Sequence, residues 1–192
     1  MRDETIMYSH LEKAFNKYLT SETEIWLHQD IFSAHWWSIV ILNAIFFVLL
    51  LILIDRYRIV LISLAFMVSF VISGIADEIG NYFDYWEYPH QFLIFTHRFN
   101  AVDFAVIPVL MTLCYQYFRK WKTYLVAQVI VSAVISFIGI PLCVYFHLYS
   151  MENWNYFNSF IVSIILFIIL KMIVDFIWKQ ANKYSPSGQK KS

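Results

Sequence analysis

The sequence has little charge, little glycine and almost no cysteine. Charged residues make up 15% of its 192 residues, and it contains four glycines and two cysteines. A typical soluble domain carries about 25% charged residues, so this composition argues against a soluble globular protein. Cys114 and Cys143 fall in separate apolar runs and lack the spacing of metal ligands. Their positions argue against a disulfide between them and against a zinc motif.

Signatures of catalysis are missing as well. The sequence contains no H-E-x-x-H motif, no H-x-x-x-H pair, no G-x-S-x-G motif and no glycine-rich phosphate loop. We therefore expect no metal site and no cofactor. The missing motifs leave open whether the protein is an enzyme.

Apolar residues dominate what is present. Hydrophobic residues account for 60% of the chain and aromatic residues for 20%. They form five runs, each close to the roughly 20 residues that a spanning helix needs: residues 37–54, 59–76, 101–118, 124–146 and 160–178. The runs are apolar on all sides, unlike the one-sided helices of soluble cores. The sequence thus predicts an all-α integral membrane bundle of five transmembrane helices, in contact with a lipid bilayer and not with nucleic acid.

Basic residues gather after the first, third and fifth runs. They are Arg56 and Arg58, then Arg119, Lys120 and Lys122, and finally Lys179, Lys183, Lys190 and Lys191. Because basic connectors stay in the cytoplasm, this pattern predicts a multi-pass plasma-membrane protein with its N-terminus outside and its C-terminus inside. The first run follows an acidic segment, so we expect it to be retained and not cleaved as a signal peptide.

The chain divides into three predicted parts. Residues 1–35 form an amphipathic helical segment at the outer surface, residues 36–180 the five-helix transmembrane domain, and residues 181–192 a disordered cytoplasmic tail. Two S-x-x-E capping boxes, at residues 9–12 and 21–24, predict a pair of short helices in the first part. Its apolar stripe consists of Met7, Leu11, Phe15 and Tyr18. The segment either packs on lipid or on the bundle, or forms a lid over an outer cavity.

Polar residues enter the second run along one helix face. Ser69, Ser73, Asp77, Asn81 and Asp84 follow one another at spacings of four, four, four and three. A charged group in hydrocarbon is energetically unfavourable unless it is paired or hydrated, so this stripe must face the bundle or water. The predicted ligand-binding residues lie here and in the following aromatic loop: Asp77, Glu78, Asn81, Asp84, Trp86, Glu87, His97, Arg98, Asn100 and Asp103.

Two classes of function are compatible with this outer cluster. In the first, a non-enzymatic membrane protein binds a small molecule, an ion, a lipid or a membrane partner there, as a homo-oligomer or an accessory subunit. In the alternative, a small intramembrane enzyme acts on a lipid or isoprenoid, with Asp77 or Asp103 as general acid. Both need Asp77 and Asp103 to converge on a partly dehydrated space. A purely structural interpretation is an interfacial aromatic belt with solvated acids.

Other polar residues within the runs suggest structural roles. Gln128, Ser132 and Ser136 form a stripe suited to close helix contact and to hydrogen bonds across it. Lys171 and Asp175, four residues apart, are placed to neutralise each other while the lysine reaches toward the interface.

Several short motifs carry a resemblance to a known family. They are Asp55-Arg56-Tyr57-Arg58, Trp86-Glu87-Tyr88-Pro89, Val106-Ile107-Pro108-Val109-Leu110, Tyr115-Gln116-Tyr117-Phe118 and Arg119-Lys120-Trp121-Lys122. Together they resemble an uncharacterised family of small five-span integral membrane proteins from spore-forming Gram-positive bacteria, over most of residues 37–178. That family carries a locus-type name without an assigned activity. The resemblance therefore implies a topology and a bacterial plasma-membrane location, but no reaction.

A fainter resemblance is to the small membrane-embedded lycopene cyclases. Those enzymes place an acidic helix end, a tryptophan-containing loop and a further acidic motif in succession, which correspond here to Asp77, Trp86 and Asp103. They also carry paired glutamates after a proline, where this chain has Asn100, Asp103 and the later Pro108. This resemblance implies acid catalysis on an isoprenoid.

Overall fold

The protein is an all-α bundle, as the apolar runs predicted. The computed structural model describes residues 2–93 and 104–183, with side chains from residue 7 onward. Its helices are α1 (Arg2–Ile25), α2 (Ala34–Leu53), α3 (Ile59–Tyr82), α4 (Val106–Tyr117), α5 (Trp121–Val134), α6 (Ile140–Tyr145) and α7 (Tyr156–Lys183). Short turns of other helix types precede α2, α3 and α6: η1 (Trp26–Asp30), η2 (Arg56–Arg58) and η3 (Ile135–Gly139).

Four helical segments are long and apolar enough to cross a membrane. They are α2, the η2–α3 segment, the continuous α5–η3–α6 segment, and α7. The third predicted run corresponds to α4, which has only 12 residues in the described part of the chain. Residues 101–103 of that run lie outside the described residues. The π-helical turn η3 ends at Gly139, two residues before Pro141 of α6.

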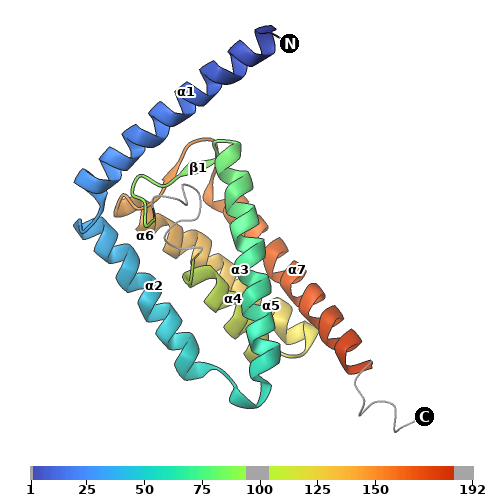
Figure 1. The fold of residues 1–192 in the computed structure, drawn as a ribbon. Coiled ribbons are helices and arrows are strands. Elements are labelled where there is room, and N and C mark those ends of the chain that lie inside the picture. The colour runs from blue at the N-terminus through green and yellow to red at the C-terminus, as the bar shows by residue number, and fades with distance from the viewer. Residues whose placement is uncertain (1, 94–103, 184–192) are drawn as a thin grey trace.

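Helix α4 lies at the centre of the packing. It contacts α2 on one side and α3 on the other, while α3 also packs along α7. Helices α2 and α3 therefore diverge from their connection at η2 (Figure 1). The core between α3, α4, α5 and α7 is formed by buried residues from all four: Leu61, Ile62, Ala65, Met111, Cys114, Tyr115, Tyr124, Ala127, Phe167, Leu170 and Val174.

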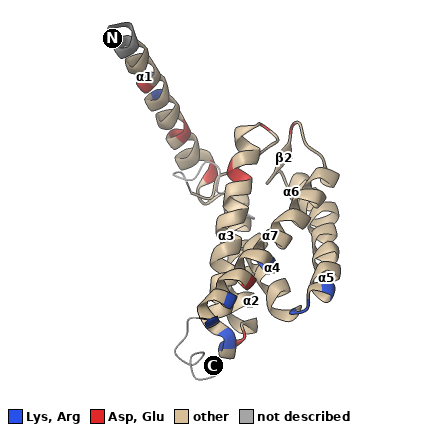
Figure 2. Ribbon diagram, turned by 90° about the vertical axis from the view of Figure 1, so that its right-hand side faces the viewer, with Lys and Arg blue, Asp and Glu red and all other residues tan. Residues whose placement is uncertain are grey.

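The two ends of the bundle differ in charge (Figure 2). Lys and Arg residues of the bundle gather where α3 and α5 begin, and this end is called the basic end below. The opposite end, called the aromatic end, carries the connections after α3 and α6. There β1 (Trp86–Glu87) pairs with β2 (Ser150–Met151) in an antiparallel ladder, with Trp86 opposite Met151.

At the basic end, one glutamine joins the α2–α3 connection to α4. The Gln116 side chain donates from Nε2 to the Leu53 carbonyl at 2.8 Å and accepts from the Asp55 amide at 2.9 Å. Arg58 donates to the Gln116 carbonyl at 3.1 Å and to the Asp55 carboxylate at 2.6 Å. That hydrogen bond from Arg58 holds the pKa of the Asp55 carboxyl below its ordinary value. The polar side chains of the Asp55–Arg58 motif thus fix the turn between two helices.

Lys171 is paired as expected but does not reach out to water. Its ammonium lies 3.4 Å from the Asp175 carboxylate and donates to the Arg119 carbonyl at 3.1 Å. The rings of Tyr115, Trp121 and Tyr124 surround it, with centroids 4.9, 5.3 and 5.0 Å away. Because the rings and the carbonyl replace water around the charge, the side chain stays buried, with 2% exposed.

The stripe on α5 and η3 is buried. Gln128, Ser132 and Ser136 are at most 1% exposed, as expected for residues at a helix interface. Gln128 Oε1 and the two serine hydroxyls make no hydrogen bond within the described part of the chain. The predicted hydrogen bonds across this stripe from the two serines are therefore not observed among the described residues.

The prediction of two short N-terminal helices is wrong. Residues Arg2–Ile25 form one helix, because the second capping-box sequence continues the helical turn instead of starting a new one. Helix α1 runs away from the bundle (Figures 1 and 2). Met7, Leu11, Phe15 and Tyr18 are between 52% and 59% exposed. Among the described residues, helix α1 therefore does not pack on the transmembrane helices or cover the aromatic end, whereas the following turn η1 contacts the loop after α3 through Trp26 and Asp30.

Candidate functional site

The polar stripe of α3 faces the bundle interior, as predicted. Ser69, Ser73 and Asp77 are almost fully buried, and the Ser69 hydroxyl lies 3.2 Å from the Thr112 hydroxyl of α4. The stripe ends sooner than expected, because α3 stops at Tyr82 and Asp84 adopts a left-handed backbone with φ 52°. This chain reversal sends the following loop back over the end of α3.

The loop supplies two hydrogen bonds to Asp77. Trp86 donates from its indole nitrogen to Asp77 Oδ1 at 2.9 Å, and the Tyr88 hydroxyl donates to the same oxygen at 2.6 Å. Asp77 is only 3% exposed. These donors stabilise a buried carboxylate and hold the loop on the helix.

An aromatic cluster covers Asp77. The Trp86 ring lies 5.3 Å from Trp154 and 6.4 Å from Tyr149, while Tyr85 stacks on Trp154 at 4.6 Å. The indole of Trp86 also lies directly on Gly80 of α3. The acidic and aromatic residues thus form a packed cap on the end of α3, in which Asp77 serves as a hydrogen-bond acceptor.

The other predicted site residues have different positions. Glu78, Asp84 and Glu87 are exposed and Asn81 is partly exposed, so they do not join Asp77 in the interior. His97, Arg98, Asn100 and Asp103 lie outside the described residues. The convergence of Asp77 and Asp103 therefore stays a prediction.

A histidine and aspartate cluster lies beside this cap. Asp30, at the corner between α1 and α2, lies 2.8 Å from Nδ1 of His90. His35 of α2 stacks on His90 with ring centroids 4.0 Å apart and planes 11° apart, and His147 lies within electrostatic range of His35. The four residues come from separate segments, so no spacing in the sequence reveals them. In the described ranges, no three His, Cys, Asp or Glu side chains are placed to hold a metal ion.

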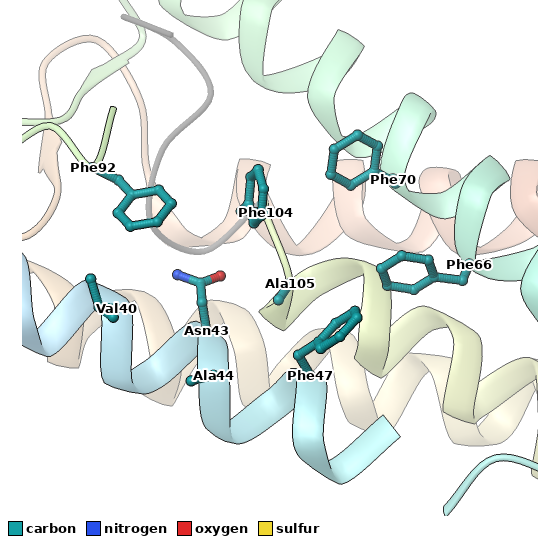
Figure 3. Close-up of a pocket in the computed structure, with 9 residues that line it drawn as sticks. All are labelled: Val40, Asn43, Ala44, Phe47, Phe66, Phe70, Phe92, Phe104 and Ala105. Carbon is teal, nitrogen blue, oxygen red and sulfur yellow. The ribbon is translucent and has the colours of Figure 1, made fainter. Parts of the chain in front are cut away.

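A cavity of about 410 Å³ lies between the middle of α2 and the middle of α3 (Figure 3). Its volume falls within the range of about 300–1,000 Å³ that is usual for small-molecule sites. Five of its lining residues are phenylalanines: Phe47, Phe66, Phe70, Phe92 and Phe104. The others described are Val40, Asn43, Ala44 and Ala105.

The phenylalanine rings of the cavity form a connected series. Neighbouring centroids are 6.3 Å apart for Phe47 and Phe66, and 5.8 Å apart for both Phe70–Phe104 and Phe92–Phe104. The Asn43 side chain points into the space below Phe104 (Figure 3). Its amide nitrogen donates to the Ile39 carbonyl at 2.9 Å. The cavity is therefore apolar and aromatic, with one amide among the described residues that line it.

Comparison with known proteins gave no match to a family model, a curated protein or a solved structure. The fold and the cavity themselves define the class: an all-α bundle with membrane-compatible helices and an aromatic cavity among them.

Proposed function

We propose that this protein is a non-enzymatic multi-pass membrane protein that binds the hydrocarbon chain of a membrane lipid between α2 and α3. The cavity is the main observation that supports this proposal. It lies at the middle of two helices that are apolar enough to span a bilayer, so lipid chains are the molecules expected beside it.

The lining favours a hydrocarbon chain over an ion or a polar metabolite. Asn43 is the polar residue of the described lining, and no charged side chain belongs to that lining. Burying an ion without partners in such a site would be prohibitively unfavourable. A hydrocarbon chain instead gains dispersion contacts with the phenylalanine rings that an empty cavity would forgo.

Selectivity must come from shape. In a bilayer, moving a chain from lipid into protein brings little hydrophobic gain, because lipid tails are themselves apolar. The fit of the chain against the phenylalanine rings then decides which lipid is preferred.

The proposal includes a bacterial plasma-membrane location with the aromatic end outside. The basic residues at the α2–α3 and α4–α5 connections support this orientation, since such residues stay cytoplasmic. The resemblance to five-span proteins of spore-forming bacteria supports the location.

The geometry around Asp77 favours binding over acid catalysis. A general acid must reach its substrate, whereas Asp77 is 3% exposed and covered by Trp86 and Tyr88. Asp77 is also not among the residues that line the α2–α3 cavity.

Photocrosslinking tests the proposal in nanodiscs of phosphatidylcholine that carries a diazirine in one acyl chain. Peptide mass spectrometry should locate adducts on Phe47, Phe66 and Phe104, in addition to the lipid-facing surface. Ala44 lines the cavity yet is exposed, so Ala44→Phe should fill the cavity without disturbing the core. We expect a reduction of about tenfold in cavity adducts, which corresponds to about 1.4 kcal/mol.

Ile45→Phe is the matched control. Ile45 is adjacent and exposed but does not line the cavity, so this variant should retain the cavity adducts. Equal labelling of the cavity in the wild type and Ala44→Phe, or labelling of the lipid-facing surface alone, would overturn the proposal. Competition with unlabelled phosphatidylcholine and with a polyprenol distinguishes an acyl from an isoprenoid chain.

A further inference from the structure

The loop Tyr88–Leu93 forms the wall of the cavity toward the aromatic end, since its Phe92 lines the cavity. Two tryptophans and one aspartate hold this loop against the corner between α1 and α2. Trp26 donates to the Gln91 carbonyl and Trp36 to the Phe92 carbonyl, each at 3.1 Å. Asp30 accepts from the Gln91 amide at 3.3 Å.

A further attachment of the loop is titratable. His90 contacts Asp30 at 2.8 Å through Nδ1 and stacks on His35 with centroids 4.0 Å apart. Among the described residues, the other titratable groups close to this pair are Asp30 of η1 and His147, which follows α6. Histidine is the side chain whose charge ordinarily changes between about pH 5 and 8.

The stack accommodates one positive charge better than two. One positive charge on the stack is compensated by the Asp30 carboxylate, which lies 2.8 Å from His90. A second positive charge would place two cations face to face, with ring centroids 4.0 Å apart. Repulsion at this distance opposes the stacked arrangement, because both charges lie within a partly desolvated site.

We propose that the stacked His35–His90 pair, with Asp30, is a proton-sensitive latch that releases the loop Tyr88–Leu93 on acidification and opens the cavity toward the aromatic end. Tyr88 remains attached to Asp77 and provides the fixed point about which the loop moves. The closed state persists at neutral pH, and the open state gains population as pH falls. This inference rests on the proposed function in one respect, the identity of the molecule that enters the cavity. The movement of the loop can be measured without a lipid ligand.

Hydroxyl-radical footprinting of the full-length protein in phosphatidylcholine nanodiscs tests the latch at pH 7.5 and pH 5.0. Oxidation of Phe92 is measured relative to Tyr57, which is fully exposed at the other end of the bundle. We expect Phe92 oxidation to rise several-fold at pH 5.0 in the wild type. Residues of the buried core, such as Met111, should show no such rise.

Two variants at His35 remove the second charge, and a third variant, at His28, serves as the control. His35→Gln and His35→Phe cannot become cationic, and the phenyl ring preserves the stack; both should abolish the rise. His28→Gln, at an exposed position of η1, should retain the rise. A wild type whose Phe92 oxidation does not change with pH, or a rise of equal size in both His35 variants, would overturn the latch.

The latch and the lipid-binding function can be tested independently. Ala44→Phe blocks the cavity but leaves the His35–His90 stack intact, so its Phe92 oxidation should still rise at pH 5.0. If the diazirine lipid labels no cavity residue while the pH-dependent rise persists, the lipid-binding function is wrong and the latch stands. If the lipid labels the cavity but Phe92 oxidation is independent of pH, the latch is wrong and lipid binding stands.

Discussion

Gly80 sets the position of the aromatic cap above Asp77. A Cβ at this residue would lie 1.9 Å from Trp86 Cζ2, well inside any allowed contact. We predict that Gly80→Ala displaces Trp86, weakens its hydrogen bond to Asp77 and destabilises the protein by about 1–3 kcal/mol, the usual range for overpacking. Thermal unfolding in detergent and a change in tryptophan emission measure the effect.

Gly139→Ala is the matched control for this substitution. A Cβ at Gly139 would meet only the Val134 carbonyl at 3.8 Å, an ordinary contact. Alanine is preferred over glycine in helices by roughly 0.5–1 kcal/mol, so this variant should be as stable as the wild type or more stable. If both variants melt like the wild type, Gly80 does not require the absence of a side chain.

The burial of Asp77 could be predicted, but its partners could not. A carboxylate within an apolar run has to face the bundle, and the spacing from Ser69 identified the face. Trp86 and Tyr88 reach Asp77 only because the chain reverses at Asp84, a backbone feature without a distinct signature in this sequence. The His35–His90 stack was missed for a related reason: 55 positions separate the two residues in the numbering, so no local pattern connects them.

Among the elements, the α2–α3 connection depends on Gln116 of α4. We predict that Gln116→Leu removes both side-chain hydrogen bonds and leaves the Asp55 amide without its partner. A buried polar group that loses its partner destabilises a protein by about 1–3 kcal/mol. The loss is measured as a lower thermal midpoint, together with faster amide exchange at the end of α2.

Gln128→Leu provides the comparison, because Gln128 is equally buried on α5. Its Oε1 makes no hydrogen bond in the described part of the chain, so leucine should leave the midpoint equal to or above that of the wild type. Equal losses from both substitutions would show that glutamine size, and not hydrogen bonding, matters at these positions.

Helix positions were predictable where hydropathy alone determines them. The run at residues 37–54 corresponds to Ala34–Leu53, and the run at 160–178 lies within Tyr156–Lys183. The N-terminal segment was harder, because a capping-box sequence inside a continuous helix looks the same as one that begins a helix. Helix existence follows from composition, whereas helix boundaries depend on contacts that are distant in sequence.

For the molecule as a whole, the cavity results from how three helices are packed. Helix α2 packs on α4 instead of following α3, so the two helices diverge and their phenylalanines face a common space. In the sequence, Phe47, Phe66 and Phe70 belong to apolar runs in which any phenylalanine is expected to face lipid or core. These phenylalanines line a cavity only because of how the helices cross. The sequence therefore indicated the acidic cluster and not the cavity.

The same packing predicts that α1 is dispensable for the bundle. Helix α1 contacts the following turn η1 and otherwise extends away from the helices (Figure 1). Deleting residues 2–25 should leave the thermal midpoint of the remaining protein unchanged. Deleting residues 2–33 also removes Trp26 and Asp30, which hold Gln91 and His90, and should lower the midpoint and expose Phe92 at neutral pH. A loss of stability already in the shorter deletion would mean that α1 supports the bundle through contacts other than these.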